Sequence, residues 1–96
     1  IELHQETMSV DECIAFYRDE VGMGVEVARA ETTKNAMFPC TAIMYWLGTQ
    51  GILDLRRDMQ AKLGPAFSLK TFHDTLLGYG SIPVPLVARM MLAEAA

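Results

Sequence analysis

The chain has 96 residues, of which 51% are hydrophobic and 21% charged, which is enough for one modest core and too little for two independent ones. Its net charge of −4 and its 8 Lys and Arg residues argue against the clustered basic surface that binds nucleic acid or an anionic membrane. The sequence shows neither a signal-peptide pattern nor an apolar run near the length of a membrane span. We therefore expect a soluble, cytoplasmic chain with no nucleic-acid and no membrane partner.

Helix start and stop signals punctuate the first part of the chain. Ser9 and Glu12 have the spacing of a capping box, in which each side chain accepts a hydrogen bond from the other residue's amide, so a helix is predicted to begin at Val10. Apolar residues then recur every three or four positions until Gly22, which can end the helix in a left-handed conformation. A second helix is predicted over 25–37, where Ala, Glu, Arg and Lys are frequent.

The third predicted helix is the longest and runs from about Pro39 to Leu63. Proline is tolerated in the first turn because its missing N–H would have no helical partner there. The helix is apolar on more than one face early, so we expect its first half to be the most buried part of the chain, with Trp46 as a core anchor. Gly48 and Gly51 each cost about 1 kcal/mol relative to alanine inside a helix, which predicts that another backbone passes close to them.

Two short helices complete the prediction. Ser68 is expected to cap a helix over 69–77, and a last helix spans 86–95 after a proline-containing turn. No stretch alternates between apolar and polar residues for long enough to predict a strand. The predicted fold class is therefore all-α, with about five helices in an irregular bundle that forms a single segment over 1–96.

The residues of an independent active site are missing from the sequence. Neither His4 nor His73 has a second histidine four residues away, and no HExxH motif is present, so we predict no metal site within this chain. Cys13 and Cys40 lie in apolar stretches without CxxC spacing, which predicts buried free thiols. The sequence also has no GxSxG nucleophile elbow and no glycine-rich phosphate loop.

An ordered series of motifs resembles a known bacterial family. PCTAIMYWLG, at 39–48, resembles the PGQAxxYxxG segment of the family called domain of unknown function 885, DUF885. Upstream, LHQETMSVDECIAFYRDEVGM is similar to that family's LHxxxM[ST]xx[ED]A segment, and GILDLRRDMQAKLGPAFSLKTFHDTLLGYGSIPVPLV resembles its closing stretch. The resemblance covers nearly the whole chain. Together with a polar lead that opens without methionine, it implies a fragment from the C-terminal end of a longer, mostly helical protein.

The resemblance also implies an activity. Full-length members carry an HExxH helix and a downstream glutamate, which is similar to zinc-dependent peptidases of the gluzincin type. Zinc is thus expected in the parent protein and not in this chain. The resemblance implies Tyr45 and His4 as catalytic residues that reach the zinc cleft and stabilise the oxyanion. It implies Lys34 and Thr41 as substrate-binding positions.

The chain departs from the family pattern at these positions. Cys40 and Thr41 replace a glycine and a glutamine, and Lys34 and Asn35 replace an arginine–tyrosine pair. A lysine lacks the planar fork with which arginine grips a carboxylate, so substrate binding is the property most affected. The resemblance therefore also fits a divergent or inactive member.

Alternative interpretations of the same residues stay open. Tyr45 fits a core tyrosine as well as an oxyanion donor, and His4 fits a solvated or capping histidine. For the whole chain, the alternative is a non-catalytic helical module that packs against a partner or a second copy of itself. The expected partners are the remainder of the parent chain or a homo-oligomer, with a peptide as the parent's substrate.

Overall fold

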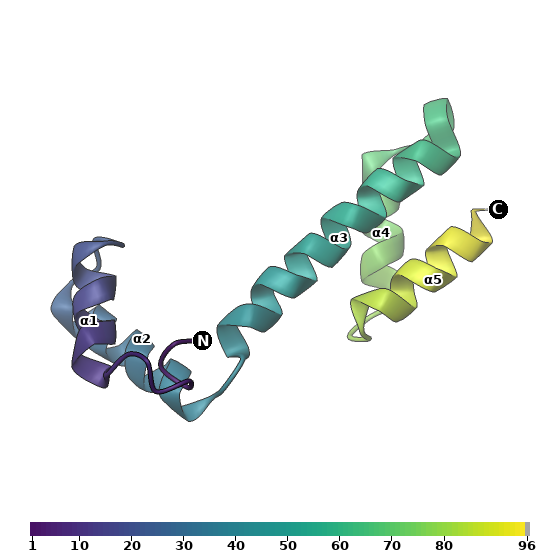
Figure 1. Cartoon of the computed structure of the whole chain (residues 1–96). Helices are drawn as coiled ribbons and strands as arrows, with labels where there is room; N and C mark the ends of the chain where they lie inside the picture. Colours follow the sequence, from purple (N-terminus) through teal and green to yellow (C-terminus); the bar gives the residue numbers. More distant parts are fainter. Residues whose placement is uncertain (96) are drawn as a thin grey trace. The chain divides into compact units, whose positions relative to one another are not determined.

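The computed structural model describes residues 1–95, and over these residues the predicted all-α fold is confirmed (Figure 1). The elements are α1 Val10–Asp19, α2 Val25–Met37, α3 Thr41–Leu63, the short 3-10 helix η1 Gly64–Ala66, α4 Leu69–Gly78 and α5 Val84–Glu94. The chain divides into two compact units, Ile1–Met44 and Tyr45–Ala96. Within the described part, no helix combines the length and apolarity needed to cross a bilayer.

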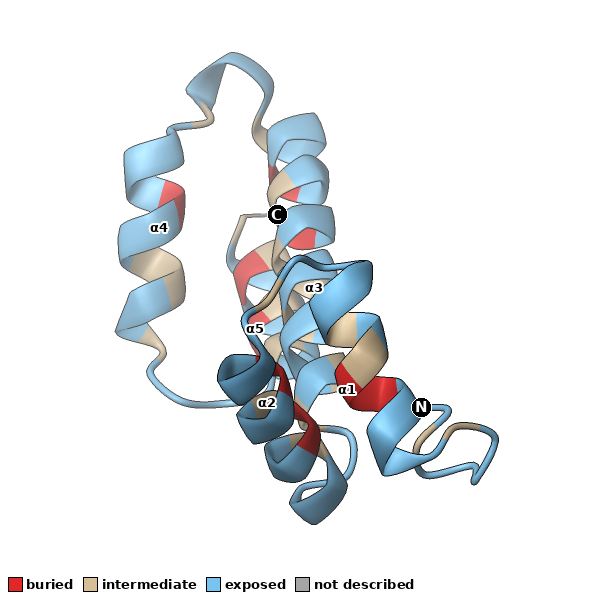
Figure 2. Cartoon of the chain, turned by 90° about the vertical axis from the view of Figure 1, so that its left-hand side faces the viewer, coloured by how far each residue is buried: buried red, intermediate tan, exposed pale blue. Residues whose placement is uncertain are grey.

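The first unit consists of turns, the packed pair α1 and α2, and the first residues of α3. The predicted capping box is present, because Ser9 Oγ accepts from the Glu12 amide at 3.1 Å and the Glu12 carboxylate accepts from the Ser9 amide at 2.7 Å. Gly22 follows α1 with a φ of +82°, as predicted. The buried residues of the helix pair, red in Figure 2, are Cys13, Ile14, Ala28 and Thr32. Three of these side chains, those of Cys13, Ala28 and Thr32, are small, which lets the two helices approach closely.

The second unit has its core between α3, α4 and α5. Its buried side chains are Leu55, Met59, Phe72, Val87 and Met91. Burying a large apolar side chain contributes about 1.5–3 kcal/mol, so this cluster is the main source of the unit's stability. The Lys62 ammonium donates to the carbonyl of Leu92 at 2.7 Å and so joins the ends of α3 and α5.

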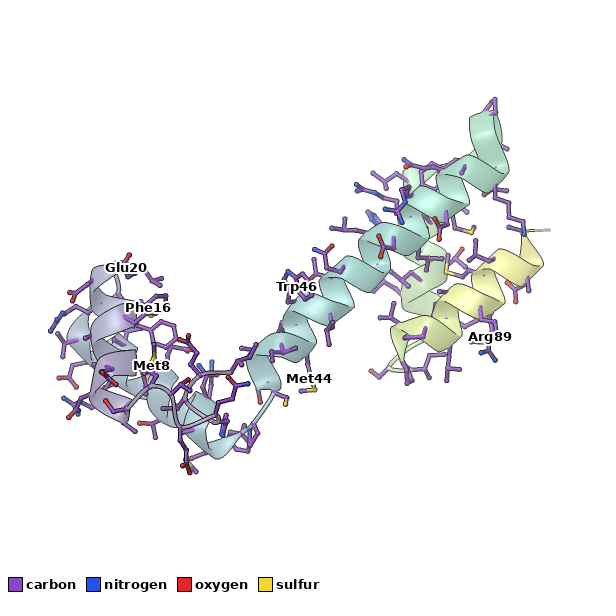
Figure 3. The ribbon with its side chains drawn as sticks, viewed as in Figure 1. Met8, Phe16, Glu20, Met44, Trp46 and Arg89 are labelled. Atoms are coloured by element: carbon purple, nitrogen blue, oxygen red, sulfur yellow. The ribbon has the colours of Figure 1, made fainter. Side chains whose placement is uncertain are left out.

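The first half of α3 contradicts the burial predicted from its composition. Met44, Tyr45, Trp46 and Leu47 are 61%, 77%, 63% and 56% exposed, so Trp46 is no core anchor in this chain (Figure 3). Apolar composition gives a helix a preference for burial but supplies no surface to pack against. The α3 residues that enter the core, Leu55 and Met59, lie in its later part, where the apolar residues form a single stripe.

The close backbone approach predicted at Gly48 and Gly51 is also wrong. At Gly48, an added Cβ would meet nothing within 4 Å among the described residues. At Gly51, an added Cβ would lie 2.9 Å from Cγ1 of Val84, so a side chain of α5 makes the close approach. Helix α5 begins at Val84, two residues before the predicted start, because Pro85 is compatible with the first turn.

Candidate functional site

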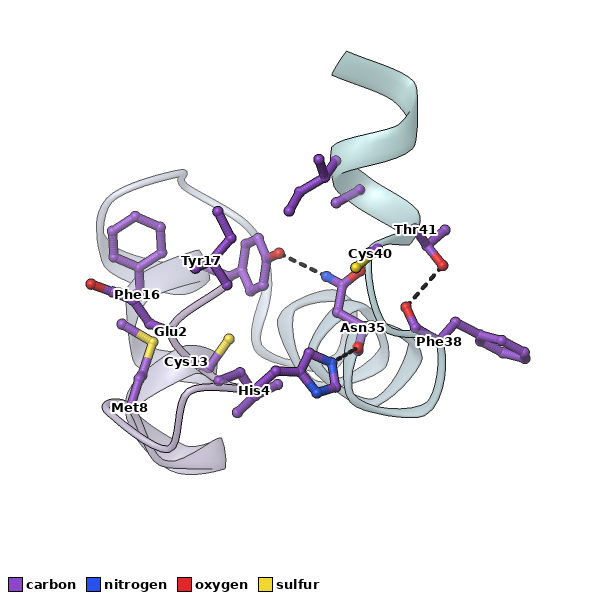
Figure 4. Close-up of a pocket in the computed structure, with 14 residues that line it drawn as sticks. Glu2, His4, Met8, Cys13, Phe16, Tyr17, Asn35, Phe38, Cys40 and Thr41 are labelled. Carbon is purple, nitrogen blue, oxygen red and sulfur yellow. Dashed lines mark hydrogen bonds between the residues drawn. The ribbon is translucent and has the colours of Figure 1, made fainter. Parts of the chain in front are cut away.

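A cavity of about 180 Å³ opens in the first unit, bordered by the N-terminal turns, α1, the end of α2 and the start of α3 (Figure 4). Most of its lining side chains are apolar. The polar side chains on its wall are Glu2, His4, Tyr17, Asn35 and Thr41. His4 and Thr41, which the sequence indicates as site residues, therefore lie on the same cavity.

The turn between α2 and α3 forms one wall of this cavity. The Phe38 carbonyl accepts the N–H of Thr41 at 3.3 Å, Pro39 stands at the second position and Cys40 has a φ of +68° at the third. These features define a type II turn, whose third position favours glycine. The Cys40 side chain is exposed on this turn, so the prediction of a buried thiol is confirmed for Cys13 and wrong for Cys40.

Thr41 uses its hydroxyl proton within the same turn. Its Oγ1 donates to the Phe38 carbonyl at 2.9 Å, which braces the start of α3. The hydroxyl oxygen keeps its lone pairs and can still accept a hydrogen bond from a ligand. A substrate-binding role for Thr41 is therefore limited to that of an acceptor.

His4 caps the end of α2. Its Nε2 lies 2.8 Å from the main-chain carbonyl oxygen of Asn35, within the last turn of the helix (Figure 4). The final carbonyls of a helix have no partner inside it, so a histidine N–H satisfies one of them. Because a carbonyl oxygen only accepts, Nε2 carries the proton and Nδ1 is an acceptor in the neutral ring. This hydrogen bond fits the capping interpretation of His4. The catalytic role of His4 stays a prediction.

Asn35 also reaches Tyr17 across the helix pair. Its side-chain Nδ2 donates to the Tyr17 hydroxyl oxygen at 2.9 Å in a partly buried bond (Figure 4). Sequence reasoning gave Tyr17 no part in a site. No spacing rule links side chains 18 residues apart, and only the packing of α1 on α2 brings them together.

Lys34 and Tyr45 occupy other surroundings. Lys34 lines a separate, open hollow on α2, and its ammonium pairs with the Glu31 carboxylate at 2.6 Å. Tyr45 belongs to the second unit, where its main-chain carbonyl accepts the Thr49 hydroxyl proton at 2.8 Å. Because Tyr45 is 77% exposed, the core-tyrosine alternative does not describe it in this chain.

The described residues do not fit a metal centre. Over 1–95, no group of three His, Cys, Asp or Glu side chains lies close enough to hold a metal ion. A structural or catalytic zinc site needs at least three protein ligands. No catalytic step through a metal can therefore be assigned to these residues.

Comparison with known proteins gives one positive result. The model of a family described as "Bacterial protein of unknown function (DUF885)" matches residues 1–91. The match spans all three motif segments that carry the resemblance, at 3–23, 39–48 and 51–87. Searches of curated proteins and of solved structures found no match.

Proposed function

The chain belongs to the bacterial DUF885 family, and on this premise we propose that it is the C-terminal helical segment of a zinc-dependent, gluzincin-type metallopeptidase-like hydrolase. In this proposal the metal ligands lie in the parent protein outside this chain, and the substrate is a peptide. This segment lines the cleft and supplies a hydrogen-bond donor to the oxyanion. Such a donor acts by stabilising charge that develops in the transition state.

The exposure of Tyr45 is the observation that supports this proposal. A tyrosine that is 77% exposed does not serve the core of this chain, and its neighbours Met44 and Trp46 are exposed apolar residues (Figure 3). Contiguous exposed apolar side chains mark surfaces that another part of a protein covers. A tyrosine on such a surface can present its hydroxyl to a cleft formed with the rest of the parent protein.

His4 is the weaker of the two oxyanion donors. Its Nε2 proton is engaged by the Asn35 carbonyl, so only Nδ1 can face a substrate. In the neutral ring Nδ1 has no proton and accepts hydrogen bonds, so His4 has no second N–H to donate to an oxyanion. The Tyr45 hydroxyl carries a proton that it can donate, so Tyr45 is the residue on which the proposal depends.

Replacing Tyr45 by phenylalanine in the full parent protein tests this role. Loss of one oxyanion donor is expected to lower turnover by about 10²–10³-fold while thermal stability stays unchanged. Tyr79→Phe is the control, since it removes a tyrosine hydroxyl elsewhere in the second unit and should leave turnover unchanged. Turnover by Tyr45→Phe equal to that of the wild type would disprove the donor role. A parallel loss of stability in Tyr45→Phe would assign the residue to packing instead.

The same exposed stretch also favours the second candidate, a non-catalytic helical module that binds a partner or its own copy. Intact mass and zinc content, measured on one purified sample, separate the two. A mass several times the 10.7 kDa of this chain with about one zinc per molecule supports the hydrolase. A mass equal to that of this chain, without zinc, supports the module.

A further inference from the structure

The cavity of the first unit contains a hydrogen-bond donor whose direction is fixed by a neighbouring amide. Nδ2 of Asn35 can only donate a hydrogen bond, so the Tyr17 oxygen is the acceptor in the 2.9 Å bond. A phenol has one proton, and that proton must then point away from Asn35. Over the described residues, the Tyr17 hydroxyl donates no hydrogen bond to the protein. The proton is therefore available to a ligand.

The rest of the cavity indicates what kind of ligand this donor serves. The volume of about 180 Å³ is comparable to that of the roughly 150 Å³ engineered cavity that holds a benzene molecule. The apolar residues that line the cavity include Met8, Phe16 and Ile43. The Glu2 side chain on the wall disfavours an anion. These features fit a neutral carbonyl group attached to one apolar substituent.

We propose that this cavity binds one apolar residue of a peptide, with a peptide carbonyl oxygen accepting the proton of the Tyr17 hydroxyl and the apolar side chain filling the cavity. Tyr17 is the binding residue, and Asn35 is a positioning residue that keeps the Tyr17 proton turned toward the ligand. The inference shares its substrate class with the proposed function. It requires neither Tyr45 nor a metal, so the two can fail separately.

Asn35→Asp tests the hydrogen-bond polarity with almost no change in shape. A carboxylate only accepts, so the Tyr17 hydroxyl is expected to donate to Asp and to withdraw its proton from the ligand. The main-chain carbonyl that binds His4 is unaffected by this substitution. Tyr17→Phe removes the donor directly and leaves the ring in place.

The assay is an NMR titration of the whole chain with N-acetyl-L-leucinamide, followed by the amide signals of the cavity residues. Tyr17→Phe and Asn35→Asp are each expected to weaken binding about five- to tenfold, the value of one neutral hydrogen bond. Thr33→Asp, which places the same charge on α2 at an exposed position, should bind as the wild type does. Tyr79→Phe, which removes a tyrosine hydroxyl from the second unit, should also bind normally.

N-acetylglycinamide, which lacks the apolar side chain, should bind much more weakly than the leucine compound. The inference is overturned if the wild type shows no shift of cavity signals with the leucine compound. It is equally overturned if Asn35→Asp binds as tightly as the wild type while its spectrum shows an intact fold. Failure of Tyr45→Phe to alter turnover in the parent protein would leave this binding result unaffected.

Discussion

Replacing Cys40 by glycine is expected to stabilise the first unit by about 0.5–1 kcal/mol. Cys40 holds a φ of +68° at the third position of the turn that joins α2 to α3. A residue with a Cβ costs about 1–2 kcal/mol in this left-handed region. Glycine removes that strain, but its greater freedom in the unfolded chain offsets about 0.5–1 kcal/mol of the gain.

Urea unfolding, followed by the NMR amide signals of α1 and α2, measures this effect within the unit that contains the turn. With a slope near 1 kcal/mol/M, typical of a small domain, the midpoint should rise by about 0.5–1 M and the slope should stay constant. Cys40→Ala is the control, because it removes the thiol but keeps both the Cβ and the strain. An equal gain in the alanine variant would refute the reasoning, since the effect would then come from the thiol. An unchanged midpoint in the glycine variant would refute it as well.

Other substitutions test packing and capping. Gly51→Ala should destabilise the second unit because the added Cβ would lie 2.9 Å from Val84 Cγ1. Gly48→Ala adds a Cβ in open space and should raise stability by up to about 1 kcal/mol. Thermal unfolding of the two variants compares these effects. Ser9→Ala should cost about 1 kcal/mol in urea unfolding through loss of the helix cap. The hydrogen bond from the Ser9 amide lowers the pKa of Glu12 in the folded chain. The stabilisation by the Glu12 carboxylate is therefore present above the unfolded-state pKa of Glu12 and is lost as the pH falls through its folded-state pKa. Glu12→Gln should weaken this pH dependence of the unfolding free energy in acid titrations.

Local chemistry made most helix boundaries predictable. The capping box of Ser9 and Glu12, the left-handed Gly22 and the break at Phe38 before a proline depend on neighbouring residues only, and each appears where the sequence places it. The exposure of the first half of α3 was not predictable in the same way. It depends on which surfaces the fold brings to the helix, and composition alone does not contain that information.

The candidate site shows the same division between local and distant signals. Pro39 followed by a position that is glycine in the family indicates a type II turn, so the strain at Cys40 could have been predicted from the sequence. The bonds that Asn35 makes to Tyr17 and His4 join residues 18 and 31 positions apart. Such bonds follow from the packing of α1 on α2 and from the path of the N-terminal turns, neither of which leaves a periodic signal in the sequence.

The exposed stretch 44–47 also bears on the choice between the two proposed functions. Consecutive residues of an α-helix advance by about 100°, so four successive apolar side chains surround the whole helix. One packed helix of a second copy covers a single face and would leave the others in water. Enclosure by several elements of a larger protein would cover all faces. The all-round apolar character of this stretch therefore favours packing within a larger protein over association of two copies through a single helix face.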